Sequence, residues 1–353
     1  MGKLVVIQTV IPHYRVKVFD KIRSEIGDDF ALYGGQFFFD KTITTTAQSK
    51  HHKNLNNHYL LGRRFLWQTG HLNEVFKDNT LVLSLNPRVL SHWVILLLRL
   101  FSRKRTILWG HAWPRSGKNS KSDKVRHVMR LLASQIIVYT EQQKLELQQK
   151  MPHKKISAAP NAVLFKNEMS SDVNQEVNDI LYVGRLIADK KPILLYQGFK
   201  KALKQLPEAT LIIIGDGPER AKLLQLRRKD GLEHRVLIPG EVTDVSLLKE
   251  YYKHTLLSAS PGYVGLSITQ SLGYGVPMII ARNEKHSPEL EAVKEGFNSQ
   301  FFNSNDENSL AQGLISFFDN KDKWLNVRNE IVEDCRNRYS IEAMTATFLN
   351  LLK

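Results

Sequence analysis

The sequence predicts an α/β fold with two doubly wound domains in tandem. Two observations lead to this prediction. The chain has 353 residues, 42% of them hydrophobic. This length exceeds the length of chain that a single hydrophobic core usually organises. Short apolar runs also alternate with helix-like stretches in two successive series, a pattern typical of parallel sheets covered on both faces. We expect a first domain over 1–166, a linker over 167–178, a second domain over 179–335, and a C-terminal helix within 336–353 that packs back on the first domain.

The first series opens at residues 3–9 with an apolar run suited to a buried parallel strand. Further strands are expected at 30–33, 80–85, 106–109 and 135–139, with helices at 16–26, 89–101, 122–133 and 141–150. Residues 36–79 are the exception, because they are polar, rich in His and Asn, and without a clean period. A long irregular insert in such a domain usually has a function.

The second series follows the polar, aperiodic segment 167–178. Strands are expected at 179–184, 209–215, 236–239, 255–258 and 278–281, with helices at 194–206, 219–228, 245–253 and 267–272. Periodic apolar residues then predict closing helices around Leu310, Leu314, Phe317, Trp324 and Phe348.

The formal charge of +15 is distributed unevenly. Residues 1–176 contain 27 Lys and Arg against 13 Asp and Glu, so this half carries +14. One stretch combines Asp123 with six cations: Arg115, Lys118, Lys121, Lys124, Arg126 and Arg130. Most charge runs are solvated helix faces. An imbalance this one-sided favours an anionic partner, which leaves nucleic acid, phospholipid headgroups and a phosphorylated substrate open.

Other features exclude several classes of protein. The single cysteine, Cys335, excludes a disulfide framework and a zinc site built on several thiolates. The longest apolar run, 93–101, is interrupted by Arg99 and is too short to span a bilayer, and no signal peptide is expected. Val125, Val128 and Leu132 suit either the core or an amphipathic anchor, and the sequence does not decide between them.

Two segments of the second half carry residues suited to binding a diphosphate. Gly184 ends a strand, and Arg185 and Lys190 follow it, so the two cations can hold a diphosphate from two sides. Gly262 and Gly265 precede a helix that contains Gln270. The amides at that helix start suit an anion, and Gln270 can bond a sugar hydroxyl. The alternatives are an ordinary basic loop and a Gly-rich turn before a buried helix. Ligands of open α/β sheets bind beyond the carboxyl ends of the strands, which favours the functional interpretation.

Further motifs complete the pattern. The stretch from Gly215 to Glu219 lacks the Gly-x-Gly-x-x-Gly spacing and is expected to be mainly structural. Pro288 and Glu289, followed by residues 295–298, are expected at a further strand end.

The order of these motifs resembles that of the retaining, nucleotide-sugar-dependent glycosyltransferases of family 4. The match covers nearly all of residues 158–300 and is specific, whereas the first half is similar only at residues 11–15 and 109–111. The resemblance implies the GT-B fold, in which two Rossmann-like domains face each other across a cleft, and a donor that is UDP- or GDP-linked. It implies no metal and no cofactor.

The resemblance also implies roles for individual residues. Arg185 and Lys190 would hold the donor diphosphate and stabilise charge on the leaving group, and His111 would face the transferred sugar as the third catalytic residue. The remaining substrate-binding residues are His13, Tyr14 and Arg15 in a loop near the acceptor, Val242 beside the base, and Gly265, Leu266, Ser267, Gln270 and Glu289 around the phosphate and sugar. His111 has an alternative role as a hydrogen-bonded core histidine.

The sequence departs from the family at one pair of positions. The family commonly has two Glu eight positions apart, where this chain has Gly262 and Gln270. Gln270 can donate and accept hydrogen bonds but carries no charge. The two explanations are an active subgroup with different contacts and a non-catalytic relative. We favour the first because the cationic and glycine positions are kept.

We therefore expect a metal-independent glycosyltransferase of cell-surface polysaccharide or lipopolysaccharide synthesis. Its acceptor would be lipid-linked, and the basic half would hold it peripherally on the cytoplasmic face of a membrane. A non-catalytic nucleotide-sugar sensor, a GT-B-like epimerase and a nucleic-acid-binding protein are the alternatives, and the last lacks a recognised binding module. His51, His52, His58 and His71 match no metal-ligand spacing.

Overall fold

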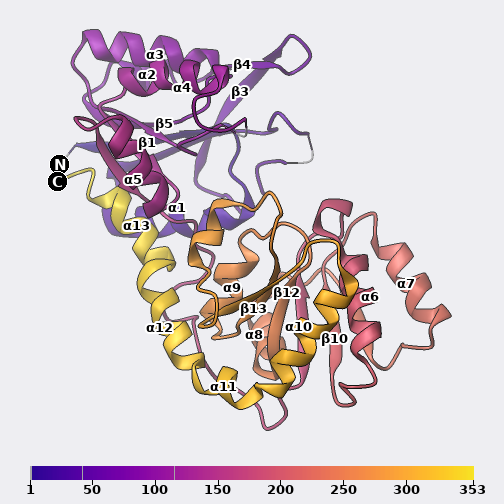
Figure 1. The fold of residues 1–353 in the computed structure, drawn as a ribbon. Coiled ribbons are helices and arrows are strands. Elements are labelled where there is room, and N and C mark those ends of the chain that lie inside the picture. Colours follow the sequence, from indigo (N-terminus) through magenta and orange to yellow (C-terminus); the bar gives the residue numbers. More distant parts are fainter. Residues whose placement is uncertain (1, 42, 115) are drawn as a thin grey trace. The chain divides into compact units, whose positions relative to one another are not determined.

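The computed structural model describes residues 2–41, 43–114 and 116–353. Arg115, the first cation of the basic stretch, therefore lies outside the described residues. The chain divides into two compact units, Met1–Val163 with Ile341–Lys353, and Leu164–Ser340 (Figure 1). Residues 167–178, for which a linker is expected, are counted with the second unit. Each unit is built on a mainly parallel sheet, so the predicted α/β fold with two doubly wound domains is confirmed.

The first unit contains an eight-stranded sheet in the order β4-β3-β2-β1-β5-β6-β7-β8. The strands are β1 (Lys3–Gln8), β2 (Phe30–Gly35), β3 (His52–Leu60), β4 (Phe65–Thr69), β5 (Asn79–Ser84), β6 (Thr106–Trp109), β7 (Gln135–Val138) and β8 (Lys155–Ala158). All neighbouring pairs are parallel except β3 and β4. Every residue of β2, β6 and β7 is buried. This burial explains why these strands appear in the sequence as nearly continuous apolar runs.

The expectation of an irregular insert over 36–79 is wrong in its second half. There β3 pairs in parallel with β2, and β4 folds back on β3 as an antiparallel hairpin. The turn uses Leu61, Gly62 and Arg63, all at positive φ. Of the 9 residues of β3, only Leu55 is buried. An edge hairpin that is this exposed needs few apolar residues, so its polar sequence hides the strand period.

Helices surround this sheet. They are α1 (His13–Ile26), η1 (Gly27–Asp29), α2 (Leu72–Val75), α3 (Leu90–Phe101), α4 (Lys121–Leu132), α5 (Glu141–Lys150) and α13 (Ile341–Leu349). Figure 1 shows α2, α3 and α4 together on one side of the sheet, and α1 and α13 on the other. The terminal helix α13 packs on α1, and the Phe348 ring meets the Trp109 ring edge-on at 4.8 Å.

The second unit contains a six-stranded, entirely parallel sheet in the order β11-β10-β9-β12-β13-β14. The strands are β9 (Asp179–Val183), β10 (Thr210–Ile214), β11 (Val236–Gly240), β12 (Thr255–Ser260), β13 (Met278–Ala281) and β14 (Ser299–Phe302). The helices are η2 (Ala188–Lys190), α6 (Pro192–Ala202), α7 (Arg220–Lys229), α8 (Val245–His254), α9 (Ser267–Gly273), η3 (Pro288–Ala292), α10 (Glu307–Asp319), α11 (Lys321–Asn326) and α12 (Arg328–Arg338). Because all strands run in one direction, the segments that follow β9, β10, β12 and β13 emerge at one edge of the sheet.

Two short strands, β8 and β14, were not expected. Both are only four residues long, and β14 begins with Ser299 and Gln300. Residues 295–298 therefore precede β14 and do not follow a strand, which corrects their expected place at a strand end. None of the helices in the described ranges is both long enough and apolar enough to cross a membrane.

Candidate functional site

The carboxyl edge of the second sheet is organised by close contact between two turns. Gly184 follows β9 and Gly215 follows β10. Gly215 has a φ of 145°, and a Cβ atom there would lie 1.9 Å from the carbonyl oxygen of Gly184. Only glycine satisfies both conditions without moving the backbone. Leu186 continues the contact, donating from its amide to the carbonyl of Asp216 over 2.8 Å. This geometry agrees with the structural role expected for this turn.

Arg185 and Lys190 converge on one residue, Tyr263. The Lys190 ammonium donates to the Tyr263 carbonyl over 2.8 Å and lies 3.6 Å from the centre of its ring. Arg185 donates from Nη2 to the Tyr263 hydroxyl over 3.2 Å. The structure therefore brings the two predicted cations together, and both lie beside the loop that contains Gly262 and Gly265.

The two cations differ in their exposure to water. Arg185 is exposed, whereas Lys190 is half-buried at the end of η2. Burial, helped by the neighbouring charge of Arg185, lowers the pKa of Lys190 to about 8. Glu289 acts in the opposite direction on the same group, so the buried carboxylate of η3 lies within electrostatic range of Lys190. A phosphate group placed here would stabilise the charged ammonium.

Gly262 is one of the two positions where the family that the sequence resembles commonly has glutamate. A Cβ atom at Gly262 would lie 2.2 Å from the carbonyl oxygen of Asp189 and 2.8 Å from Cα of Lys190. Backbone therefore fills the space that any side chain would need. The loop that carries Lys190 therefore lies directly against Gly262.

The segment after β13 is hydrogen-bonded to the loop from Gly262 to Ser267, through Val264. The amide of Val264 donates to Nδ1 of His286 over 3.0 Å, and Nε2 of His286 lies 2.9 Å from the Ala281 carbonyl, which requires the proton on Nε2. The amide of Ser287 donates to the Val264 carbonyl over 3.0 Å. Burial lowers the pKa of His286 and so favours the neutral ring that can accept at Nδ1.

Gly265, Leu266 and Ser267 lie where the sequence places them, directly at the start of α9. A Cβ atom at Gly265 would be 3.8 Å from Nζ of Lys190, so this turn and the lysine border the same space. Gln270 lies one turn into α9 and is half-buried. The amide of Ile268 donates to the Gly265 carbonyl over 3.1 Å. The amides of Gly265, Leu266 and Ser267, at the start of the helix, suit an anion beside Lys190.

Glu289 and Val242 lie in two different segments of this unit, after β13 and after β11. Glu289 is buried in η3. Val242 is half-buried in the loop between β11 and α8. The preceding Gly240 accepts from the amide of Gly215 over 2.8 Å, which joins the end of β11 to the end of β10.

In the first unit, three predicted residues occupy the start of a helix. His13, Tyr14 and Arg15 were expected in a loop, but they form the first turn of α1, which begins directly after Pro12. Arg15 donates to Oε1 of Gln8 and to the hydroxyl of Tyr139, both over 2.6 Å. His13 is exposed.

His111 follows β6 and is also exposed. Its ring lies 4.7 Å from the ring of Tyr139, edge-on, and its carbonyl accepts from Arg126 over 2.9 Å. The structure therefore brings His111 and Arg15 to the same tyrosine, at the carboxyl ends of β6 and β7. Its exposure argues against the alternative of a core histidine.

The remaining histidines are dispersed. His52 lies within hydrogen-bonding distance of Ser49 and Asn54, and His58 of Thr69. His71 is buried, and burial lowers its pKa to about 4, so it is neutral. Over 2–41, 43–114 and 116–353, no group of three or more His, Cys, Asp and Glu side chains is placed to hold a metal ion.

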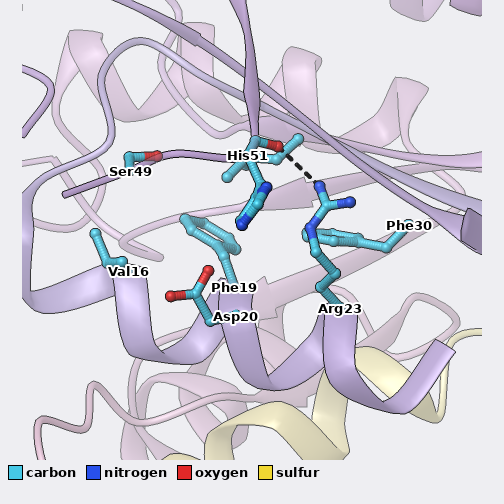
Figure 2. A pocket seen from close by; sticks show the side chains of 8 residues that line it. Val16, Phe19, Asp20, Arg23, Phe30, Ser49 and His51 are labelled. Atoms are coloured by element: carbon cyan, nitrogen blue, oxygen red, sulfur yellow. Dashed lines mark hydrogen bonds between the residues drawn. The ribbon is translucent and has the colours of Figure 1, made fainter. Parts of the chain in front are cut away.

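A small, partly open pocket lies elsewhere in the first unit, between α1 and the segment before β3 (Figure 2). It is lined by Val16, Phe19, Asp20, Arg23, Phe30, Leu32, Ser49 and His51, and Arg23 donates to the His51 carbonyl over 2.8 Å. Its volume of about 10 Å³ has room for at most one water molecule. None of the predicted site residues lines it.

Two further residues, Tyr263 and His286, shape the site in the second unit and were not predicted from the sequence. Tyr263 lies between Gly262 and Gly265 and was not assigned a role, although an aromatic residue between two glycines after a strand was a usable signal. His286 carries no such signal, because its importance depends on a contact with Val264, which is 22 residues away.

Comparisons with known proteins show similarity to glycosyltransferases. The sequence model of the family described as "Glycosyl transferases group 1" matches residues 165–338. A GtfA subunit of a UDP-N-acetylglucosamine–peptide N-acetylglucosaminyltransferase from Streptococcus parasanguinis is 28% identical over 195 residues, which are 53% of this chain and 36% of that protein. The amylovoran biosynthesis glycosyltransferase AmsD from Erwinia amylovora is 30% identical over 156 residues, 42% of this chain and 43% of that protein. The chain thus spans less than half the length of either curated relative.

Solved structures extend the likeness to the whole chain. Alr3699/HepE from Anabaena, solved in complex with UDP, is 17% identical and matches with a TM-score of 0.70 over 100% of this chain and 99% of that one. At this identity the likeness establishes the fold, which is that of the GT-B glycosyltransferases.

Proposed function

We propose that this GT-B chain, whose residues 165–338 match the group 1 glycosyltransferases, transfers a sugar from a nucleotide sugar with retention of the anomeric configuration. The observation that carries the proposal is the convergence of Arg185 and Lys190 beside the Gly265 turn. Two cations and a row of helix-start amides at one sheet edge suit a diphosphate.

In this proposal Arg185 and Lys190 are catalytic because they touch the leaving group. The bond between the anomeric carbon and the diphosphate oxygen breaks, and the cations stabilise the negative charge that develops on that oxygen. The acceptor oxygen forms its bond to the same face of the anomeric carbon, and its proton passes to the departing phosphate. The protein then supplies positioning and charge, with no nucleophile of its own and no metal.

Other residues bind the rest of the donor. The amides of Gly265, Leu266 and Ser267 meet the phosphate and the sugar, and Val242 lies beside the base. Gln270 and Glu289 bond sugar hydroxyls. The donor is a UDP-sugar, a choice supported by the UDP complex of the Anabaena structure.

The first unit supplies the acceptor side. His111 meets the transferred sugar, and His13, Tyr14 and Arg15 lie near the acceptor, which is a lipid-linked glycan of polysaccharide or lipopolysaccharide synthesis. The amylovoran relative supports the polysaccharide role, and the charge of residues 1–176 supports a membrane-borne, phosphate-linked acceptor reached from the cytoplasmic face.

Gly262 motivates a second candidate, a nucleotide-sugar-binding protein without transferase activity. The backbone of Asp189 and Lys190 closes the space of the family's carboxylate, so a contact common in the family is absent. We favour the enzyme because the same closure brings Lys190 to the loop that binds the sugar phosphate.

Donor binding tests the proposal. Thermal shift is measured with UDP, GDP and their sugar conjugates, for the wild type and for Arg185→Ala and Lys190→Ala. Lys204→Ala is the matched control, because Lys204 is an exposed lysine of the same unit. The proposal expects stabilisation by a uridine nucleotide that both site variants lose and the control keeps. Lack of stabilisation by every nucleotide would overturn it.

A further inference from the structure

Two helices of the first unit bury charged residues and expose apolar ones. In α3, Val94, Leu97, Leu98 and Phe101 recur at helical spacing and are between 41% and 84% exposed. The one charged residue of that helix, Arg99, is completely buried. A helix on the surface of a water-soluble domain normally has the opposite arrangement.

The inward charge of α3 has a structural reason. Arg99 donates to the carbonyls of Val75 over 2.9 Å, Asn79 over 2.6 Å and Arg105 over 2.9 Å. The guanidinium thus satisfies carbonyl groups at the end of α2, where a cation is favourable, at the first residue of β5 and just before β6. Rotating α3 to bury its leucines would remove these bonds, so the exposed apolar face is built into the fold.

The same inversion occurs in α4, which packs against α3. Asp123 and Arg130 form a completely buried ion pair at 2.8 Å, while Val125, Val128 and Leu131 are each at least half exposed. Helix α2 also contacts α3, and Leu72 of α2 and Phe76 directly after it are exposed. Figure 1 shows the three helices together at one side of this unit. We call these exposed residues of the three helices the apolar face: Leu72, Phe76, Val94, Leu97, Leu98, Phe101, Val125, Val128 and Leu131.

Charge complementarity indicates what covers this face. The two acidic residues of the three helices, Glu74 and Asp123, are buried. Lys121 and Lys124 are exposed and share a side of α4 with Val125 and Val128. Lys77 and Arg103 are exposed after α2 and α3, and Asp78 is the one exposed acid beside them. Aliphatic and aromatic side chains bordered by lysines match a layer of acyl chains beneath anionic headgroups.

We propose that the apolar face docks on a bilayer containing anionic phospholipid. Helix α3, about 18 Å long from the usual rise per residue, lies in the plane of the interface. Its outward side chains enter the acyl boundary, while Lys121, Lys124 and Arg103 contact lipid phosphates. The inference rests on the proposed function for its purpose, which is to bring the enzyme to a membrane-borne acceptor. The docking itself needs neither donor nor acceptor.

Vesicle sedimentation with the full chain tests the inference. The vesicles contain either 30% phosphatidylglycerol in phosphatidylcholine or phosphatidylcholine alone, without nucleotide. The variant Leu97→Asp with Phe101→Asp is compared with Leu145→Asp and Leu247→Asp, which change two exposed leucines on α5 and α8 and alter the charge equally. We expect the first pair to lose at least about tenfold in partitioning to anionic vesicles and the second to stay within about twofold.

A third variant keeps the test valid if the first pair misfolds. Lys121→Ser with Lys124→Ser leaves the apolar residues intact, and we expect weaker binding to anionic vesicles only. Two outcomes overturn the inference. The first is equal sedimentation of the wild type and the first two double variants with anionic vesicles. The second is a dimer in sedimentation velocity that Leu97→Asp with Phe101→Asp dissociates, because this would assign the apolar face to a second copy of the chain. Thermal shift with UDP on the same proteins separates this inference from the proposed function, because nucleotide binding and vesicle binding can each fail alone.

Discussion

The affinity for a nucleoside diphosphate should depend on pH through Lys190. Its pKa of about 8 in the free protein follows from burial and from the neighbouring Arg185. The ammonium is then about 90% charged at pH 7 and about 10% charged at pH 9. If the diphosphate binds only to the charged form, the apparent Kd for UDP rises about tenfold over this range, which is about 1.4 kcal/mol.

The sign of the effect follows from linkage. A bound phosphate raises the pKa of Lys190, so binding takes up a proton once the free ammonium begins to lose its own. Full affinity is present below about pH 7 and is lost as the pH rises through 8. Isothermal titration of UDP at pH 7, 8 and 9 measures this slope.

Lys190→Arg is the control, because guanidinium remains charged throughout this range. It removes the titration of the protein and keeps any titration of the nucleotide. We expect a steeper loss of affinity in the wild type than in Lys190→Arg, and a loss of about 10- to 100-fold at pH 7 in Lys190→Ala, the worth of a charge-assisted hydrogen bond. Equal slopes for the wild type and Lys190→Arg would refute the assignment of Lys190 to the diphosphate.

Three further substitutions test the loops around the cations. Gly215→Ala should lower the free energy of unfolding by at least about 3 kcal/mol in denaturant titration, because its Cβ atom would meet a carbonyl 1.9 Å away at a φ of 145°; a change below 1 kcal/mol would contradict the packing of the two turns. Gly262→Glu restores the common family residue, yet it should reduce UDP binding and not raise the transfer rate, since the Asp189 carbonyl lies 2.2 Å from the new Cβ atom. His286→Leu removes the acceptor for the Val264 amide and should cost about 1–3 kcal/mol in stability and also weaken UDP binding; unchanged binding would show that the loop does not meet the donor.

Most of the fold was predictable because parallel strands buried on both faces leave a clear sequence pattern. Residues 179–183 and 210–214 are almost continuous apolar runs, and both form strands close to the expected positions. The hairpin of β3 and β4 was not predictable in this way. Its strands lie at an exposed edge, where polar residues such as His52 and Asn56 are compatible with the ladder and hide its period.

The site was predictable to the extent that it depends on strand ends. Arg185 and Lys190 follow β9, the Gly265 turn follows β12, and a parallel sheet brings these segments to one edge. The closure of backbone on Gly262 and the support from His286 depend on contacts between distant segments, which have no local signature. The orientation of α3 is a further case, because the sequence shows its apolar and charged residues but not that Arg99 would be needed inside.

The transfer reaction itself tests the central claim most directly. A UDP-sugar that binds in the thermal-shift panel is incubated with the protein and a membrane-lipid extract, and the release of UDP and the anomeric configuration of the new glycosidic bond are measured. We predict extract-dependent UDP release with retained configuration, lost in Arg185→Ala and Lys190→Ala and kept in Lys204→Ala. An inverted product would contradict the retaining mechanism, and tight donor binding without turnover on any extract would contradict the transferase and leave a nucleotide-sugar-binding protein.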